Sequence, residues 1–255
     1  MTLRVQAGRL LLLALIPAAG LAAIRIAPRW LTPEPSLASF LTRIHERDFA
    51  GANDLVPALR VTRRGDVLAE LLYEFPRGAK PGAALDAMRG QAVAFFPRGR
   101  VYDLQLAFRW HDFREEAAGA TYRVDLRCEA TPARSFGPFP AGTTLVPQAP
   151  GADLGPPGAA CEWRLLSGDR TLDRAIFEIL PPEPRRAIST RLAAAHVLAS
   201  DDYVAERWLQ AMAYASARCY GDSLAALEAV LSTAPADPFL NVAREHLAAE
   251  LRASL

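Results

Sequence analysis

The feature that most constrains this chain is an apolar run close to its N-terminus, LLLLALIPAAGLAAI, which extends from Leu10 to Ile24. Arginines flank the run on both sides. It is short for a bilayer core, which needs roughly 20 apolar residues in a helix. It reaches across only if Arg9 and Arg25 extend their charged ends toward the lipid headgroups. We interpret residues 1–30 as a single-pass membrane anchor.

Two other interpretations of this run stay open. A basic start, a short apolar middle and small residues at its end are also typical of a cleavable secretory signal, cut near Ala22 or Ala23. A buried core helix is the third interpretation. The first two both place the rest of the chain outside the cytoplasm. We therefore expect a protein of the inner (cytoplasmic) membrane with most of its chain in the periplasm, or alternatively a secreted protein.

The amino-acid composition fits an exported globular body and argues against one class of partner. The chain has 255 residues, of which 51% are hydrophobic, enough for a sizeable core in one or two domains. Its formal net charge of +1 argues against nucleic acid, because a nucleic-acid binder carries a strong basic excess. Arginine strongly outnumbers lysine, since Lys80 is the only lysine, which is typical of a GC-rich bacterial genome.

Charge is unevenly distributed along the chain. Basic residues exceed acidic ones between positions 60 and 100, and acidic residues exceed basic ones from position 196 to the end. Ordinary solvated surfaces explain both regions. The alternative is that the two regions attract each other or a shared partner.

Apolar residues at helical spacing predict several helices after the apolar run. Ser36 is a suitable N-cap for the first, residues 48–59 predict a second, and Asp66 caps a third that Pro76 ends. Residues 83–96, AALDAMRGQAVAFF, predict one more helix.

The pattern then changes to an alternation of apolar and polar residues, which is typical of half-buried strands. Alternation over residues 101–110 and again over 121–128 predicts a β-hairpin. Residues 161–165 predict a third strand, and residues 171–180 a fourth after the turn SGDR. We expect a small antiparallel sheet.

A long segment rich in proline and glycine, residues 131–160, separates the second and third predicted strands. Prolines lack a backbone donor and glycines lose more conformational entropy, so we expect an irregular loop without a strand ladder. Long loops within compact domains are usually functional or disordered. Phe136 and Phe139 either anchor this loop to the domain or dock a partner.

Three cysteines allow one disulfide and leave one thiol. Cys128 ends one predicted strand and Cys161 begins another, so a bridge between them would join two strands of the sheet. In an oxidising compartment such a bridge contributes about 3 to 4 kcal/mol on the chain-entropy model. We take this pair as the candidate disulfide. Cys219 is interpreted as a small buried apolar residue, with a reactive thiol as the alternative.

The clearest domain boundary is the sequence PPEP at positions 181–184. Helical periodicity beyond it predicts four helices, at residues 185–199, 203–217, 223–233 and 239–253. We therefore expect an α+β fold with three parts. These are an N-terminal transmembrane helix, an exported mixed domain at 31–180 with the small antiparallel sheet, and C-terminal helical hairpins at 185–255.

One of these helical hairpins has the residue pattern of a known family. Residues 204–235 resemble a tetratricopeptide hairpin at these positions: Ala211, Tyr214, Tyr220, Ser223, Leu227 and Pro235. The resemblance implies two closely packed helices and a groove for a partner. The chain departs from the family at Val230, where alanine is usual. One copy is present where about three make an independent array, so an ordinary helical bundle is the alternative.

Sequence motifs for nucleotide, calcium, zinc or nucleophilic chemistry do not occur in the chain. We therefore predict no catalytic residue, no cofactor and no metal site. The alternative is an exported hydrolase acting on envelope material, with His111 and Asp112 after the first predicted strand as its catalytic pair. Turn capping is the structural explanation of the same pair.

The sequence thus predicts a membrane-anchored, exported adaptor or assembly subunit of a bacterial envelope complex, without enzymatic activity. We expect it to bind other proteins through exposed aromatic positions. The candidates are Trp208, Tyr214 and Tyr220 in the C-terminal helices, with Phe136 and Phe139 in the loop. A small-molecule ligand is not indicated by any motif. The alternatives are the exported hydrolase and a secreted module that binds a small ligand or lipid.

Overall fold

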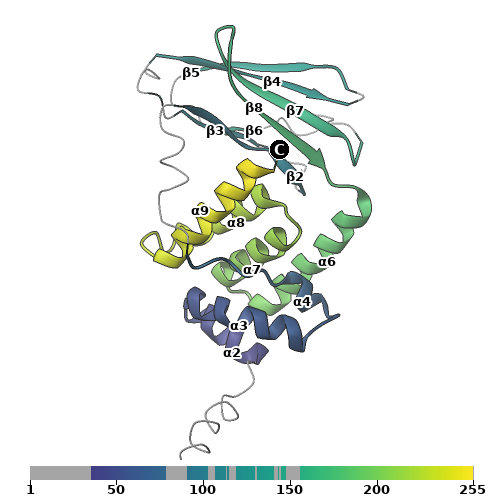
Figure 1. Cartoon of the computed structure of the whole chain (residues 1–255), viewed down its shortest axis with the longest axis vertical. Helices are drawn as coiled ribbons and strands as arrows, with labels where there is room; N and C mark the ends of the chain where they lie inside the picture. The colour runs from purple at the N-terminus through teal and green to yellow at the C-terminus, as the bar shows by residue number, and fades with distance from the viewer. Residues whose placement is uncertain are drawn as a thin grey trace, which may run out of the picture.

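The structure, a computed structural model, describes residues 36–78, 91–102, 107–112, 114, 119–129, 131–140, 143, 145–147 and 156–254. Within these residues the strands lie at one end of the molecule and the helices at the other (Figure 1). The mixed α+β class predicted from the sequence is therefore confirmed. The predicted membrane anchor at 1–30 lies outside the described residues. Among the helices that are described, none is both long and apolar enough to cross a membrane.

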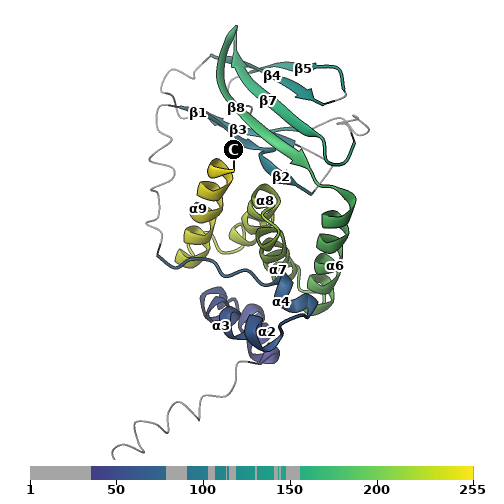
Figure 2. The same cartoon turned by 45° about the vertical axis from the view of Figure 1, so that its right-hand side comes forward.

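The helical body combines the two ends of the described chain. Its helices are α2 (Leu37–His45), α3 (Phe49–Thr62), α4 (Val67–Leu71), α6 (Pro182–Ala199), α7 (Tyr203–Ser216), α8 (Tyr220–Leu231) and α9 (Pro238–Ala253). One hydrophobic core joins the first three helices to the last four. Phe49 and Phe75 contact Trp208 at its centre, with ring centroids 5.1 and 5.2 Å from the indole. In Figure 2, α2 and α3 lie at the end of this body furthest from the strands.

This arrangement differs from the predicted domains, which grouped residues 31–180 as one mixed unit. Residues 40–75 contribute to the core of the helices that follow Pro181, while residues 92–179 supply the core between the sheets. The physical reason is that helical periodicity shows that a face is buried but does not identify what covers it. The chain therefore starts in the helical body, builds the strands and returns to the helices.

Helix ends follow the signals in the sequence. An acidic or hydroxyl side chain accepts a backbone N–H bond in the first turn of most described helices; these caps are Ser36, Asp48, Asp66, Asp202 and Asp237. Pro182 and Pro238 occupy first helical positions, where the missing N–H has no intrahelical partner to lose. The four helices predicted after PPEP are confirmed, with shifted ends.

The strand body consists of two sheets around one core. Its strands are β1 (Ala92–Phe96), β2 (Gly99–Val101), β3 (Ala107–Asp112), β4 (Thr121–Cys128), β5 (Arg134–Pro140), β6 (Leu145–Pro147), β7 (Ala160–Ser167) and β8 (Arg170–Ile179). The strand orders are β1-β3-β6 and β2-β8-β7-β4-β5. β2 runs parallel to β8, and the other described pairs are antiparallel. Trp163 is buried in this core and contacts Phe108, with ring centroids 5.2 Å apart.

Three expectations from the sequence fail in the strand body. The strands at 107–112 and 121–128 do not form a hairpin, because β3 pairs with β1 and β6 while β4 pairs with β5 and β7. Residues 92–96 form a strand and not the end of a helix. Residues 134–140, expected to be irregular, form the edge strand β5 despite two prolines, because an edge strand needs donors on one side only. Alternation identifies the buried face of a strand but not its neighbour.

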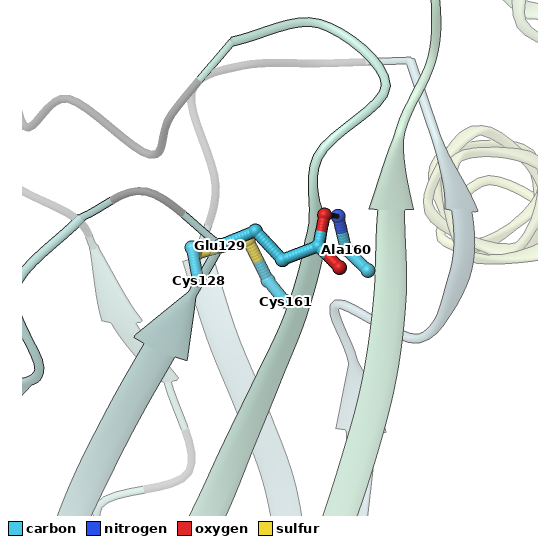
Figure 3. Close-up of a disulfide and its surroundings, with 4 residues drawn as sticks. All are labelled: Cys128, Glu129, Ala160 and Cys161. Atoms are coloured by element: carbon cyan, nitrogen blue, oxygen red, sulfur yellow. Dashed lines mark hydrogen bonds between the residues drawn. A yellow bond between two sulfur atoms is a disulfide. The ribbon is translucent and has the colours of Figure 1, made fainter.

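The candidate cysteine pair lies at the end of the β4–β7 ladder. Cys128 and Cys161 face each other in register and are joined by a disulfide, with their Cα atoms 4.0 Å apart (Figure 3). Just beyond it, the Glu129 N–H donates to the carbonyl oxygen of Ala160 at 3.0 Å. Cys219 is a buried free thiol, and its burial, together with Asp222 nearby, raises its pKa to about 12. A thiol with that pKa is protonated at neutral pH and therefore a poor nucleophile.

The two bodies meet where α8 and α9 approach β1 and β2. The Tyr102 N–H donates to Asp222 Oδ2 at 3.0 Å, which ties the residue after β2 to α8. Gly221 lacks a side chain at the point where the Phe96 ring lies, and a Cβ there would overlap the ring. These contacts hold the helical body and the strand body in one arrangement.

Candidate functional site

A cleft of about 490 Å³ opens between β8, the start of β1 and the end of α9. Five arginines and one aspartate line it, and we call it the arginine cleft. Its charged lining residues are Arg98, Arg114, Arg170, Asp173, Arg174 and Arg252. Among the described residues β2 pairs only with the end of β8, at Phe177–Ile179, so the earlier residues of β8 border the cleft.

Arg98 forms the buried floor of this cleft. Its side chain is only 5% exposed, and its Nη2 donates to the carbonyl oxygen of Arg174 at 2.8 Å. The same nitrogen lies 3.4 Å from Asp173 Oδ2, and the buried Nε has no hydrogen-bond partner within the described residues. Burial lowers the pKa of Arg98, Asp173 opposes the change, and Arg252 adds to it. Arginine stays charged in proteins, so this is a desolvated cation with incomplete hydrogen bonding.

Asp173 is the carboxylate of the arginine cleft, and its Oδ2 already interacts with other groups of the protein. Its Oδ2 accepts a hydrogen bond from the Ala94 N–H at 2.8 Å, which links β1 to β8. The same oxygen faces Arg98. One carboxylate does not balance five guanidinium groups, so the described lining has a large excess of positive charge.

Arg114 has a second carboxylate of its own. Asp112 accepts hydrogen bonds from Arg114 Nε at 2.8 Å and from the Tyr122 hydroxyl at 2.8 Å. The Arg114 side chain is the largest cause that holds the pKa of Asp112 down at about 2, while burial acts in the opposite direction. A carboxylate with this pKa and these donors is a poor general base. The side chain of His111, its partner in the hydrolase hypothesis, lies outside the described part of the structure.

The other three arginines of the cleft are Arg170, Arg174 and Arg252, and none has an ion pair within the described residues. Arg174 also lies opposite Arg164 of β7 in register, where like charges repel. Arg164 is compensated by Glu162, with Nε 2.5 Å from Oε1. Arg174 has no such compensation in that part of the chain, so a bound anion would supply it.

A second cleft, of about 650 Å³, adjoins the first along β8, and we call it the α9 cleft. It lies between β2, the end of β8, and helices α8 and α9. Its charged and hydroxyl-bearing lining residues are Arg100, Glu178, Arg218, Tyr220, Glu250 and Ser254. Two arginines and two glutamates balance there, unlike in the arginine cleft. Ile176 lines both clefts and is 41% exposed, so the two clefts meet at this apolar side chain.

The predicted docking residue Trp208 is fully buried, so the expectation that it is exposed to a partner is wrong. It lies in the helical core, with the Phe239 ring centroid 5.9 Å from its own. Its position on the apolar face of a helix was readable from the sequence. That Phe49 of α3 and Phe75, which follows α4, cover this face was not, because both are distant in the chain.

Tyr214 and Tyr220 lie at the junction of the two bodies. Tyr214 is half-buried against Tyr102, with ring centroids 5.6 Å apart. Tyr220 lines the α9 cleft, and its hydroxyl interacts with Glu250. The close helix contact implied by the tetratricopeptide resemblance is present between α7 and α8, where Ser223 Oγ donates to the Ala211 carbonyl oxygen at 2.7 Å.

Phe136 and Phe139 anchor β5 to the core of the strand body. The Phe136 ring lies 5.6 Å from Phe108, and the Phe139 ring lies 6.0 Å from Trp110. Both side chains are half-buried. The geometry therefore favours the anchoring interpretation of this pair over docking.

Sequence reasoning missed the arginine cleft. Arg98 belongs to the basic region at 60–100, but Arg174 comes from a strand and Arg252 from the last helix. One usable signal was the alternation along β8, which puts Arg174 and Ile176 on one face. No group of three or more potential metal ligands occurs among the residues described. A lining rich in guanidinium groups instead suits anions, because each offers several N–H donors in a planar fork.

No protein-family model matches the chain, and no curated protein matches it.

Proposed function

We propose that this protein is an exported, non-catalytic adaptor or assembly subunit, held at the inner (cytoplasmic) membrane by its N-terminal segment, that binds an acidic region of a partner protein. One observation carries the proposal. The Arg98 guanidinium is buried with its Nε unpartnered among the described residues, at the floor of a cleft where Arg174 and Arg252 have no ion pair within that part of the chain.

Unsatisfied groups in the cleft provide the binding free energy. A buried donor without a partner costs about 1 to 3 kcal/mol, and an anion that accepts its hydrogen bond removes that cost. Guanidinium groups bind carboxylates through paired N–H bonds that are stronger than neutral hydrogen bonds. Clustered positive charge also raises the association rate of an acidic partner, most strongly at low ionic strength.

A second function, binding of a free small anion, is supported by the size of the arginine cleft. Pockets for small molecules have volumes of about 300 to 1,000 Å³, and the cleft of about 490 Å³ lies within this range. Such pockets are predominantly apolar, whereas most of the residues that line this one are charged or polar. We therefore place the small-anion function second.

The test is co-purification of the full-length protein from its native membranes in mild detergent at low ionic strength. Arg174→Gln combined with Arg252→Gln removes two charges from the cleft. Arg123→Gln combined with Arg127→Gln removes two charges from exposed positions of β4 and is the matched control. We expect the same partner with the wild type and the control, and about tenfold less with the cleft variant.

Two results would contradict the proposal. Equal recovery of the partner with the cleft variant would exclude the arginine cleft as the docking site. Absence of any stable partner from the wild-type preparation would argue against an adaptor altogether.

A further inference from the structure

We infer that the occupant of the two clefts is an extended acidic peptide segment that lies along β8, with a carboxylate in the arginine cleft and, two residues away, an apolar side chain on Ile176. The inference rests on the proposed function and specifies the chemistry and spacing of the partner segment.

The spacing comes from the alternation of side chains along β8. Ala175 and Phe177 are buried in the core of the strand body, whereas Arg174, Ile176 and Glu178 lie on the opposite face. Successive side chains on one face of a strand are about 6.6 Å apart. An extended peptide has the same repeat, so a carboxylate bound at Arg174 places the side chain two positions along at Ile176.

Ile176 favours a peptide over a free anion as the occupant. It is one of the few large apolar side chains with substantial exposure in the described chain, and it stands where the two clefts meet. A small anion in the arginine cleft would leave Ile176 in water. An apolar side chain of a peptide would cover it, and removal of that surface from water is favourable.

The dimensions of the two clefts also fit a peptide. Together they follow β8 from Arg170 to Glu178, a path of roughly 26 Å that corresponds to about eight extended residues. The end of α9 borders both, with Arg252 lining the arginine cleft and Ser254 the α9 cleft. A Cβ at Gly99 would lie only 3.0 Å from Ser254 Cβ, so α9 abuts β2 closely. Fixed walls reduce the entropy lost on binding.

The test uses three labelled peptides of about eight residues and the full-length protein in detergent micelles at low ionic strength. The first peptide carries Glu, with Leu two positions later. The second has Gln in place of Glu, and the third has Leu directly after Glu. By fluorescence anisotropy we expect the second to bind about tenfold more weakly, because it loses the charge-assisted hydrogen bonds, and the third about threefold more weakly.

Two variants and a control assign each contact. Arg174→Gln should abolish the preference for Glu over Gln and retain the preference for the position of Leu. Ile176→Ser should do the reverse. Arg123→Gln on β4 should retain both preferences. Thermal unfolding of each variant is measured first, so that a folding defect is not mistaken for a lost contact.

The outcomes separate this inference from the proposed function. Equal binding of the first and third peptides would overturn the inference and leave an anion site intact. Competition by inorganic phosphate or acetate at the same concentration as the peptide would overturn it too, and would identify a free anion as the ligand. Equal binding of the Glu and Gln peptides, or no binding by any peptide, would refute both the inference and acidic recognition by the cleft.

Discussion

Two arginine-rich regions of the strand body use the same residue type in different ways. On the outer face of β4, Arg123 Nε donates to Asp125 Oδ1 at 3.1 Å, and the same oxygen accepts from Ser135 Oγ. In the arginine cleft, the buried Arg98 shares one aspartate with the backbone, and Arg174 has no ion pair within the described residues. The charge of Arg123 on β4 is compensated inside the fold. Charge in the arginine cleft is not compensated to the same extent within the described residues.

The difference arises at one strand of the five-stranded sheet. Across neighbouring strands, Asp125 of β4 faces Arg164 of β7, which in turn faces Arg174 of β8. The pair Asp125–Arg164 has opposite charges, whereas the pair Arg164–Arg174 has like charges. Along β8, the position after Arg174 on the same face is Ile176, where β4 has the acidic Asp125 after Arg123. Within the described residues, Arg123 of β4 is therefore compensated by an acidic neighbour, whereas Arg174 of β8 is not.

The two largest expected effects are on stability, and the first concerns the carboxylates of the two regions. Asp173→Ala removes the bond to Ala94 and leaves Arg98 buried without a carboxylate. Breaking a buried ion pair costs about 3 to 5 kcal/mol, and because Asp173 is 29% exposed we expect a loss of about 2 kcal/mol in the free energy of unfolding. Asp125→Ala removes an exposed pair, for which we expect less than about 1 kcal/mol. Urea unfolding of both variants measures the difference.

The affinity of Asp173→Ala for an anion should change in the opposite direction to its stability. Asp173 repels an anion in the cleft, so Asp173→Ala should bind the acidic peptide more tightly although the protein is less stable. Asp125→Ala should leave the affinity unchanged. Equal losses of stability in both variants, or weaker binding by Asp173→Ala, would remove the distinction between the two regions.

The next effect is a stability change that depends on pH. It distinguishes Arg114, which has an ion pair, from the cleft arginines that have none within the described residues. The pKa of Asp112 is lowered to about 2, mainly by Arg114, from an unfolded value of about 3.9. A carboxylate with a lowered folded pKa stabilises the protein fully above its unfolded pKa, and this contribution is lost as the pH falls through the folded pKa. We expect Asp112→Asn to cost about 2 kcal/mol at pH 7.

The cost of Asp112→Asn should shrink between pH 4 and pH 2, because the unfolded chain binds a proton at this carboxylate there while the folded protein still keeps it ionised. Unfolding by urea at pH 7, 4 and 2.5 follows this change. A cost that is independent of pH would mean that Asp112 acts through packing and not through its charge, and would count against an ion pair that holds Arg114 in place.

Local signals in the sequence predicted much of the helical body and little of the sheets. Ser36 and Asp66 begin helices as predicted, because a cap depends on residues within one turn. The predicted hairpin of residues 101–110 with 121–128 was wrong, because pairing depends on strands distant in the chain. The prediction of the α+β class was nevertheless correct, because the class depends only on which helices and strands are present and not on how the strands pair.

The arginine cleft was beyond prediction for the same physical reason. Arg98 lies in the connection between β1 and β2, Arg174 lies in a strand and Arg252 near the end of a helix, and only the folded chain brings the three together. Trp208 shows the converse: its helix was predicted, but the sequence did not show that Phe49 and Phe75 pack against it, so its burial was missed. Sequence periodicity assigns faces, whereas a site requires knowing which faces meet.

The smallest expected effect comes from a variant in which β8 carries an acidic residue on this face, as β4 does. Arg174→Glu places a carboxylate opposite Arg164, so a repulsive cross-strand pair becomes attractive. We expect a gain of about 0.5 kcal/mol in the free energy of unfolding at low salt, decreasing as salt screens the pair. Binding of the acidic peptide should be lost in the same variant. A residue whose replacement stabilises the fold and abolishes binding is retained for binding, whereas a loss of stability would show that Arg174 serves the fold.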